Sequence, residues 1–197
     1  MHTRLRCLAL FLLLALTGCN AVLVTEPVGD EPVTLETGKW QGTWLSREFT
    51  LITTVLDAEA GLLQAAWLER GQDGANMEVY RGHVRSSGEW LFISMPKPPP
   101  EEVAQGTAAE DGAAGEDGVA EYFWARLSND GRSAVVWWPS VEAFRAAVRE
   151  GRLPGIVKED DDVRLGELQP DHLALINAPA SGLLGWEEPM VFVRIAD

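Results

Sequence analysis

Few side chains of the 197-residue sequence are of a type and spacing that could do chemistry. His83 and His172 stand apart, and neither has a partner in the H-x-x-x-H spacing of a zinc site. The acidic run over residues 159–162 offers hard oxygen ligands for calcium, but it lacks the alternating acidic spacing of a calcium loop. A solvated acidic loop is the alternative interpretation, and we expect no metal and no cofactor.

Nucleophiles and phosphate-binding loops are equally sparse. Ser140 precedes an apolar stripe and is best explained as a helix cap, while Ser181-Gly182 is typical of a turn. The sequence contains no G-x-S-x-G elbow, no G-x-x-x-x-G-K loop and no G-x-G-x-x-G loop. Adjacent carboxylates such as Glu187 and Glu188 point in different directions and form no acid–base pair. The sequence therefore predicts a protein without enzymatic activity.

Cys19 is the one side chain with a specific chemical context. Two arginines precede an unbroken apolar stretch over residues 8–16, which is too short to span a bilayer as a helix. Leu16-Thr17-Gly18-Cys19 follows, and this N-terminal segment resembles the signal peptide and lipobox of bacterial lipoproteins. An ordinary signal peptide with an incidental cysteine is the alternative.

The resemblance implies that residues 1–18 are removed by cleavage between Gly18 and Cys19, and that Cys19 carries acyl chains. Each buried methylene contributes about 0.8 kcal/mol, so two or more chains hold a protein stably on a membrane. In Gram-negative lipoproteins an Asp after the cysteine favours the inner membrane; Asn20 implies the outer membrane, with the domain facing the periplasm. Because Cys7 leaves with the signal peptide, the mature chain would hold no disulfide and no catalytic thiol.

The remaining chain divides into a short linker and one domain. Residues 19–37 are acidic, contain two prolines and have little hydrophobic periodicity, which predicts a lipidated cysteine followed by a flexible tether. A short first strand over residues 21–25 is the alternative. Residues 38–197 are expected to form a single β domain. Within it, residues 96–120 are rich in Pro, Glu, Asp, Gly and Ala and predict a disordered acidic insertion.

Short runs of Val, Ile, Leu, Phe and Trp, separated by Gly and Asx turns, predict an antiparallel meander. Alternation places one face of each strand in the core, with Val191, Val193 and Ile195 forming that face in the last strand. Both faces are apolar in residues 90–93 and 135–138, so these strands are expected to be covered on both sides. The predicted strands are 39–46, 48–56, 62–69, 77–85, 89–95, 121–128, 133–138 and 190–195.

Two short helices are predicted before the last strand. The first is capped by Ser140, carries an apolar stripe within residues 141–148 and ends before Gly151. The second starts near Pro170 and ends before Pro179. Both are expected to cover the sheet rather than to form an independent unit.

Gly38-Lys39-Trp40 and Gly42-Thr43-Trp44 both fit the pattern G-x-W at the start of the first predicted strand. Together with the strand count, this pattern resembles the opening of lipocalin-type barrels, which implies a mainly β fold closing into a lipocalin-like barrel of seven to eight strands. In that family a tryptophan closes one barrel end beneath a cationic side chain, which implies Trp44 and Arg194 as the barrel-closing pair. The family's barrel interior holds a small apolar ligand. The alternative is that these tryptophans are ordinary core residues.

The net charge of −14, from 16 Lys+Arg and 30 Asp+Glu, argues against a nucleic-acid partner. The layout as a whole is similar to small uncharacterised Gram-negative lipoproteins, which implies no activity. We therefore expect a non-catalytic envelope lipoprotein held on the membrane through Cys19. Two functions stay open: the domain binds an apolar small molecule or lipid, or it is an interaction or assembly-accessory module for an envelope protein.

Overall fold

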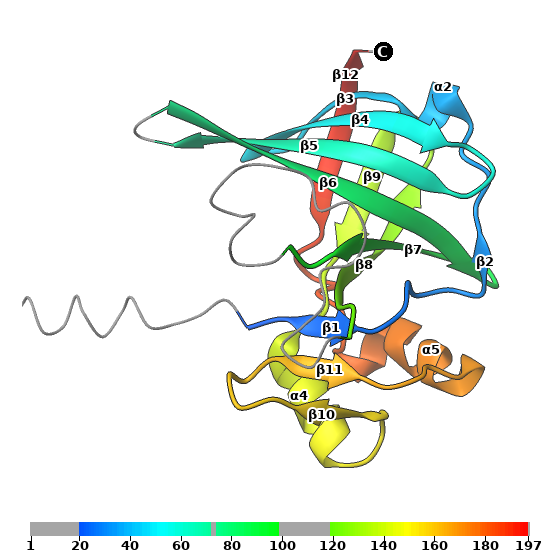
Figure 1. Cartoon of the computed structure of the whole chain (residues 1–197), viewed down its shortest axis with the longest axis vertical. Helices are drawn as coiled ribbons and strands as arrows, with labels where there is room; N and C mark the ends of the chain where they lie inside the picture. Colours follow the sequence, from blue (N-terminus) through cyan, green and yellow to red (C-terminus); the bar gives the residue numbers. More distant parts are fainter. Residues whose placement is uncertain (1–19, 72–73, 99–118, 197) are drawn as a thin grey trace, which may run out of the picture.

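The computed structural model describes residues 20–71, 74–98 and 119–196, and its main unit is a closed antiparallel β-barrel of eight strands (Figure 1). Each strand of the meander pairs with the next, and the last strand closes the barrel between the first and the one before it. The predicted mainly β barrel is confirmed. The barrel strands are β3 (Gly42–Leu45), β4 (Phe49–Asp57), β5 (Leu62–Gly71), β6 (Gly74–Ser87), β7 (Trp90–Pro96), β8 (Tyr122–Asn129), β9 (Ser133–Trp137) and β12 (Met190–Ala196).

The start of the first barrel strand differs from the prediction. A strand was expected from Lys39, but Thr37–Trp40 form the short helix α2, and β3 begins only at Gly42. Gly42 has a φ of 147°, a backbone conformation that glycine adopts far more easily than other residues. This helical turn places the buried Trp40 at the end of the barrel.

The prediction that residues 19–37 include a flexible tether is wrong for the described part of that segment. β1 (Val22–Val24) pairs in parallel with β11 (Val163–Leu165) and antiparallel with β8, while β2 (Glu31–Pro32) pairs with β6. A chain that buries this many apolar side chains belongs to the folded domain, and the alternative of a short first strand is the correct one. The buried apolar side chains of this segment are Val22, Leu23, Val24, Val28 and Leu35.

A second layer covers the outer face of the barrel at β7, β8 and β9 (Figure 1). Both predicted helices are present in it, and Ser140 caps the first by accepting a hydrogen bond from the Ala143 amide. Phe144 of this helix packs edge-on against Trp124 of β8, with ring centroids 5.7 Å apart. The layer consists of β1, β11, α4 (Val141–Arg149), β10 (Gly155–Val157), α5 (Pro170–Asn177) and the 3-10 turn η1 (Pro179–Ser181).

This layer explains the two strands with apolar residues on both faces. In β7, Phe92 packs into the second layer, while Leu91 and Ile93 pack inside the barrel. In β9, Trp137 packs outward and Val136 inward. The expectation that the strand is covered on both sides is confirmed for β7, whereas every residue of β9 stays partly exposed and Trp138 is 37% exposed.

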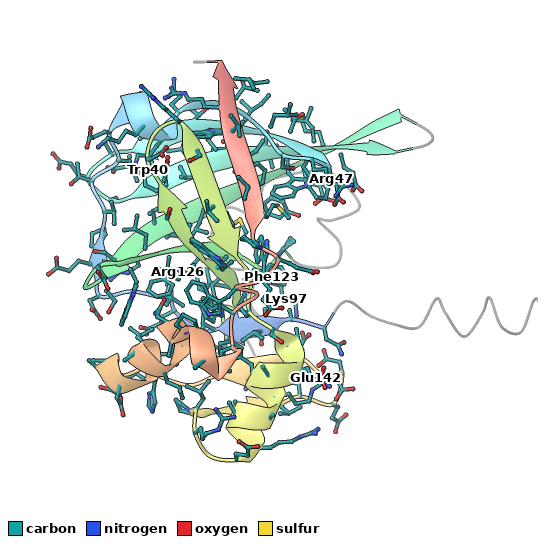
Figure 2. All side chains as sticks on the ribbon, turned by 180° about the vertical axis from the view of Figure 1, so that it is seen from behind. Trp40, Arg47, Lys97, Phe123, Arg126 and Glu142 are labelled. Atoms are coloured by element: carbon teal, nitrogen blue, oxygen red, sulfur yellow. The ribbon has the colours of Figure 1, made fainter. Side chains whose placement is uncertain are left out.

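Arg126 of β8 fastens the barrel to the chain that precedes β12. Its guanidinium carbon lies 4.6 Å from the ring centroid of Trp137 and 4.7 Å from that of Trp186, in the region between barrel and helices where Figure 2 labels it. Such stacked cation–π contacts stabilise by about 0.5 to 2 kcal/mol. Burial lowers the pKa of Arg126, which nevertheless stays a cation at neutral pH.

The predicted buried face of the last strand is wrong. Val191, Val193 and Ile195 are 46, 54 and 59% exposed, whereas Phe192 is 1% exposed and faces the barrel interior. Because side chains alternate along a strand, assigning the wrong face to the core misplaces every residue of that strand at once. The inward face carries a large aromatic ring and Arg194, which pairs with Trp44 across the β12–β3 ladder.

The predicted disordered insertion at residues 96–120 falls mostly outside the described residues. Its described ends are fixed, since Pro96 completes β7 and the Lys97 amide donates to the Glu121 carbonyl at 2.8 Å. Among the described residues, no helix combines the length and the apolar character that crossing a membrane requires.

Candidate functional site

One end of the barrel is plugged by packed tryptophans and by hydrogen-bonded polar side chains. Trp44 is 2% exposed, and its indole N–H donates to the Thr53 hydroxyl at 2.9 Å. That hydroxyl donates in turn to the main-chain carbonyl of Trp40 at 2.5 Å. The chain thus uses one buried threonine to tie both tryptophans of the G-x-W pattern into the barrel end.

The structure brings the predicted pair of Trp44 and Arg194 together at this end. The guanidinium carbon of Arg194 lies 5.6 Å from the Trp44 ring centroid. The guanidinium also donates to the carbonyls of Gly38, Gln41 and Gly131, the second at 2.6 Å and the third at 3.3 Å. Because these carbonyls come from α2, the α2–β3 junction and the β8–β9 turn, one side chain joins three segments. Trp40, Trp44, Thr53 and Arg194 are called the plug below.

The opposite end, called the mouth, holds an apolar cavity of about 340 Å³. It lies at the barrel end that contains the β3–β4 turn, the end of β7 and the start of β8; Figure 2 labels Arg47 of the β3–β4 turn on the opposite side of the barrel from Trp40. Inward-facing side chains of seven barrel strands and Trp138 form its wall, because one face of every strand points into a barrel. Its lining includes Trp67, Ile93, Met95, Phe123, Trp138 and Phe192.

Aromatic rings give the mouth its shape. Trp67 lies between Phe49 and Phe192, with ring centroids 4.7 Å and 5.7 Å apart. Trp138 at the rim is 37% exposed. Such rings provide large apolar contact area with few rotatable bonds, so they keep a cavity open at small entropic cost.

Tyr80 and Glu78 supply the polar side chains of the cavity wall. The Tyr80 hydroxyl donates a hydrogen bond to the Glu78 carboxylate. Burial, together with this hydrogen bond and the charge of Glu78, holds the pKa of Tyr80 well above its usual 10.0. Tyr80 therefore stays neutral at any physiological pH, and the hydroxyl has its partner within the protein.

The size of the cavity limits what it can hold. An apolar cavity of about 150 Å³ accepts one benzene molecule, so a cavity of about 340 Å³ has room for roughly a dozen carbon atoms. That volume matches a single acyl chain segment or a small ring system and lies near the lower limit of typical ligand sites. Below it, towards the plug, a remaining cavity measures only about 80 Å³.

A larger cleft of about 510 Å³ lies outside the barrel, between residues 24–30 and residues 166–168 with Leu173. Glu26, Asp30 and Glu167 place several carboxylates along it. Its wall is mostly polar and open to water, which suits a solvated crevice rather than a site for an apolar molecule.

The histidines and the serine that the sequence offered as candidate metal-binding or catalytic residues make structural contacts. The His172 ring accepts a hydrogen bond from the Gln169 amide and completes the cap of α5. Ser140 caps α4, and His83 contacts the ring of Tyr122 at a centroid distance of 6.4 Å. Within the described parts of the chain, no group of three or more His, Cys, Asp and Glu is arranged to hold a metal ion.

The acidic run over residues 159–162 contributes to a buried ionic cluster instead. Glu121 is 1% exposed, and Lys158 and Lys97 lie 3.2 and 3.5 Å from its carboxylate. Lys97 also contacts Asp162 at 3.1 Å. Burial alone lowers the pKa of Lys97, but the two carboxylates outweigh it and raise that pKa above its ordinary value. The cluster ties the end of β7 and the start of β8 to the second layer.

Gly18 and Cys19 lie outside the described residues, so the structure places neither. Sequence reasoning did not identify Trp67, Tyr80 and Phe192 as cavity residues, although the alternation of their strands contained the signal. No protein-family model, curated protein or solved structure matches the chain.

Proposed function

We propose that the protein is a non-catalytic, lipid-anchored envelope protein whose barrel binds one small apolar molecule or one acyl chain of a lipid. The observation that supports this most directly is the apolar cavity of about 340 Å³ at the mouth, with the other barrel end plugged. A cavity lined mainly by apolar side chains, with Glu78 and Tyr80 as its polar ones, favours an apolar ligand.

The N-terminal sequence supports the anchor. The lipobox-like residues 16–19 precede the described domain directly, and Asn20 in place of an aspartate supports the outer membrane and the periplasmic side. Cys19→Ser tests this part. We expect the variant to accumulate unprocessed and to leave the membrane fraction, whereas normal processing and membrane fractionation would refute the anchor.

Ligand binding is tested with a matched pair of variants in β5. Ala65 lines the cavity, while its neighbour Ala66 alternates to the outer face. We expect a soluble form starting at Asn20 to bind decanol in isothermal titration calorimetry and brominated decanol to quench tryptophan fluorescence. Ala65→Phe should abolish both signals by filling the cavity, and Ala66→Phe should keep them. Equal binding by both variants, or none by the wild type, would contradict the proposal.

A second candidate is the interaction module, which an exposed apolar patch favours. Leu45, Val191, Val193 and Ile195 are each at least 46% exposed, and Val193 pairs with Leu45 across β12 and β3. Contiguous exposed apolar side chains often mark protein contacts. If an envelope protein with an apolar surface docks here, crosslinking in intact cells should give one discrete product that Val193→Lys removes while decanol binding persists. A product that Val193→Lys leaves unchanged would exclude this patch.

A further inference from the structure

The described chain is held to the folded domain from its second residue onward. The amide of Ala21 donates to the Asp162 carboxylate at 2.7 Å, and its carbonyl accepts from the Val163 amide at 2.8 Å. Val22 then pairs with Val163 in the β1–β11 ladder. Only Asn20 therefore separates Cys19 from a fixed point on the domain, and a single residue spans at most about 3.6 Å.

This fixed point lies beside the mouth of the barrel. The Asp162 carboxylate that holds Ala21 also contacts Lys97, two residues beyond the cavity-lining Met95. Leu23 pairs with Phe123, which lines the same cavity. In both figures β1 begins on the side of the molecule towards which the β5–β6 hairpin points.

Both barrel ends present apolar and charged side chains, and among the described residues the exposed aromatic ring of Trp138 lies at the mouth. Around the mouth, Met77, Val119 and Trp138 are 54, 41 and 37% exposed. Arg47, Glu48 and Glu69 are exposed at the mouth as well. The plugged end has the ion pair of Lys39 with Glu36 at 2.6 Å, the exposed Asp130, and Ile195, which is 59% exposed. Tryptophan and aliphatic side chains suit the boundary between water and a bilayer, whereas charged groups suit water.

From this arrangement we propose that the mouth faces the membrane that carries the Cys19 anchor, with its rim against a zwitterionic lipid surface and the plug directed into the aqueous compartment. The inference rests on the anchor of the proposed function. With no slack in the chain, an anchor beside the mouth holds that end at the bilayer and the plug a barrel length away. The full sequence has a net charge of −14, and the loss of Arg4 and Arg6 with residues 1–18 makes this 14 − 30 = −16. A charge of this sign disfavours an anionic surface, which is why the partner is zwitterionic lipid.

The test uses the mature lipidated protein in vesicles of phosphatidylethanolamine and phosphatidylcholine. Met77→Cys and Asp130→Cys each introduce one thiol at an exposed position, at the mouth and at the plugged end, for a spin label. Relaxation by oxygen and by a water-soluble nickel complex reports the depth of each label. We expect the ratio of relaxation by oxygen to relaxation by nickel to be several-fold higher at position 77 than at position 130. The ratio at position 77 should not increase when phosphatidylglycerol replaces part of the neutral lipid.

The outcomes separate the anchor from the orientation. Protein that does not float with the vesicles refutes the anchor and the orientation that depends on it. Protein that floats while both labels report water, or while position 130 lies deeper, refutes the orientation alone and leaves anchoring intact. A higher oxygen-to-nickel ratio at position 77 on adding anionic lipid would refute the proposal that the rim lies against a zwitterionic surface.

Discussion

The two ends of the barrel are built from the same alternating strands but have opposite character. At the plug, Trp44 hydrogen-bonds Thr53 and lies beneath Arg194, so a cavity of only about 80 Å³ remains. At the mouth, Trp67 and Phe192 line an open cavity. Hydrogen bonds and the Arg194–Trp44 contact close one end, whereas at the other end the rings of Trp67 and Phe192 leave the cavity of the proposed ligand accessible.

The largest expected difference between the ends concerns their tryptophans. Trp44→Ala should lower the free energy of unfolding by about 3–5 kcal/mol, because it empties a buried site and removes the indole N–H that donates to the Thr53 hydroxyl. Trp67 at the mouth is only partly buried, so Trp67→Ala should lower the free energy of unfolding by less than half of that amount. Urea denaturation checks both, and equal losses would contradict the assignment of stability to the plug.

Arg194 gives the next effect. Arg194→Met keeps the apolar stem but removes the donors to the Gly38, Gln41 and Gly131 carbonyls, which should cost about 2 kcal/mol. Arg194→Lys should recover little, since an ammonium lacks the planar fork. Decanol affinity should stay unchanged in both variants; a fall in affinity with no loss of stability would reverse the roles of the two ends.

Much of this arrangement could be predicted from sequence because local patterns determine it. The eight strands follow from apolar alternation between glycine and Asx turns, and α4 from the Ser140 cap and its apolar stripe. Trp44 and Arg194 were paired through resemblance to a family whose barrel closes in this way. Their contact depends on a first and a last strand meeting, which only closure of the barrel provides.

Other features depended on contacts that no local pattern contains. Residues 21–24 looked like a tether because their strand partners lie about a hundred residues and more away, in β8 and β11. Val191 and Val193 looked like core because the sequence shows which residues share a face and not which face is inward. The cavity depends on how the inward-facing side chains of seven barrel strands pack together, and no local residue pattern encodes that packing.

Thr53 offers a smaller and more specific test of the plug. Thr53→Val keeps the shape but leaves the Trp44 indole N–H and the Trp40 carbonyl without this partner, at an expected cost of about 1–2 kcal/mol. Tyr80→Phe is the counterpart at the mouth and should cost less, because water reaches the carboxylate of Glu78 there. Thermal and urea unfolding compare the two, and a larger cost for Tyr80→Phe would contradict the account.

The smallest effect is the pH dependence that Tyr80 gives to stability. Burial and Glu78 raise its pKa in the folded state above the ordinary 10.0, so above that pH the unfolded chain loses a proton that the folded chain keeps. The contribution of Tyr80 to the free energy of unfolding should therefore be fully present below about pH 9. It should fall as the pH rises past 10, by less than about 1.4 kcal/mol per pH unit. Urea midpoints of Tyr80→Phe should decline less over that range, and parallel decline in both proteins would contradict the role of Tyr80.

Native mass spectrometry of the protein released from its own membranes tests the central claim most directly. The wild type and Ala66→Phe should each carry an apolar adduct in the mass range of a single acyl chain or small ring system, and Ala65→Phe should carry none. A clean unliganded mass for all three proteins, or the same adduct on Ala65→Phe, would contradict a ligand-binding mouth.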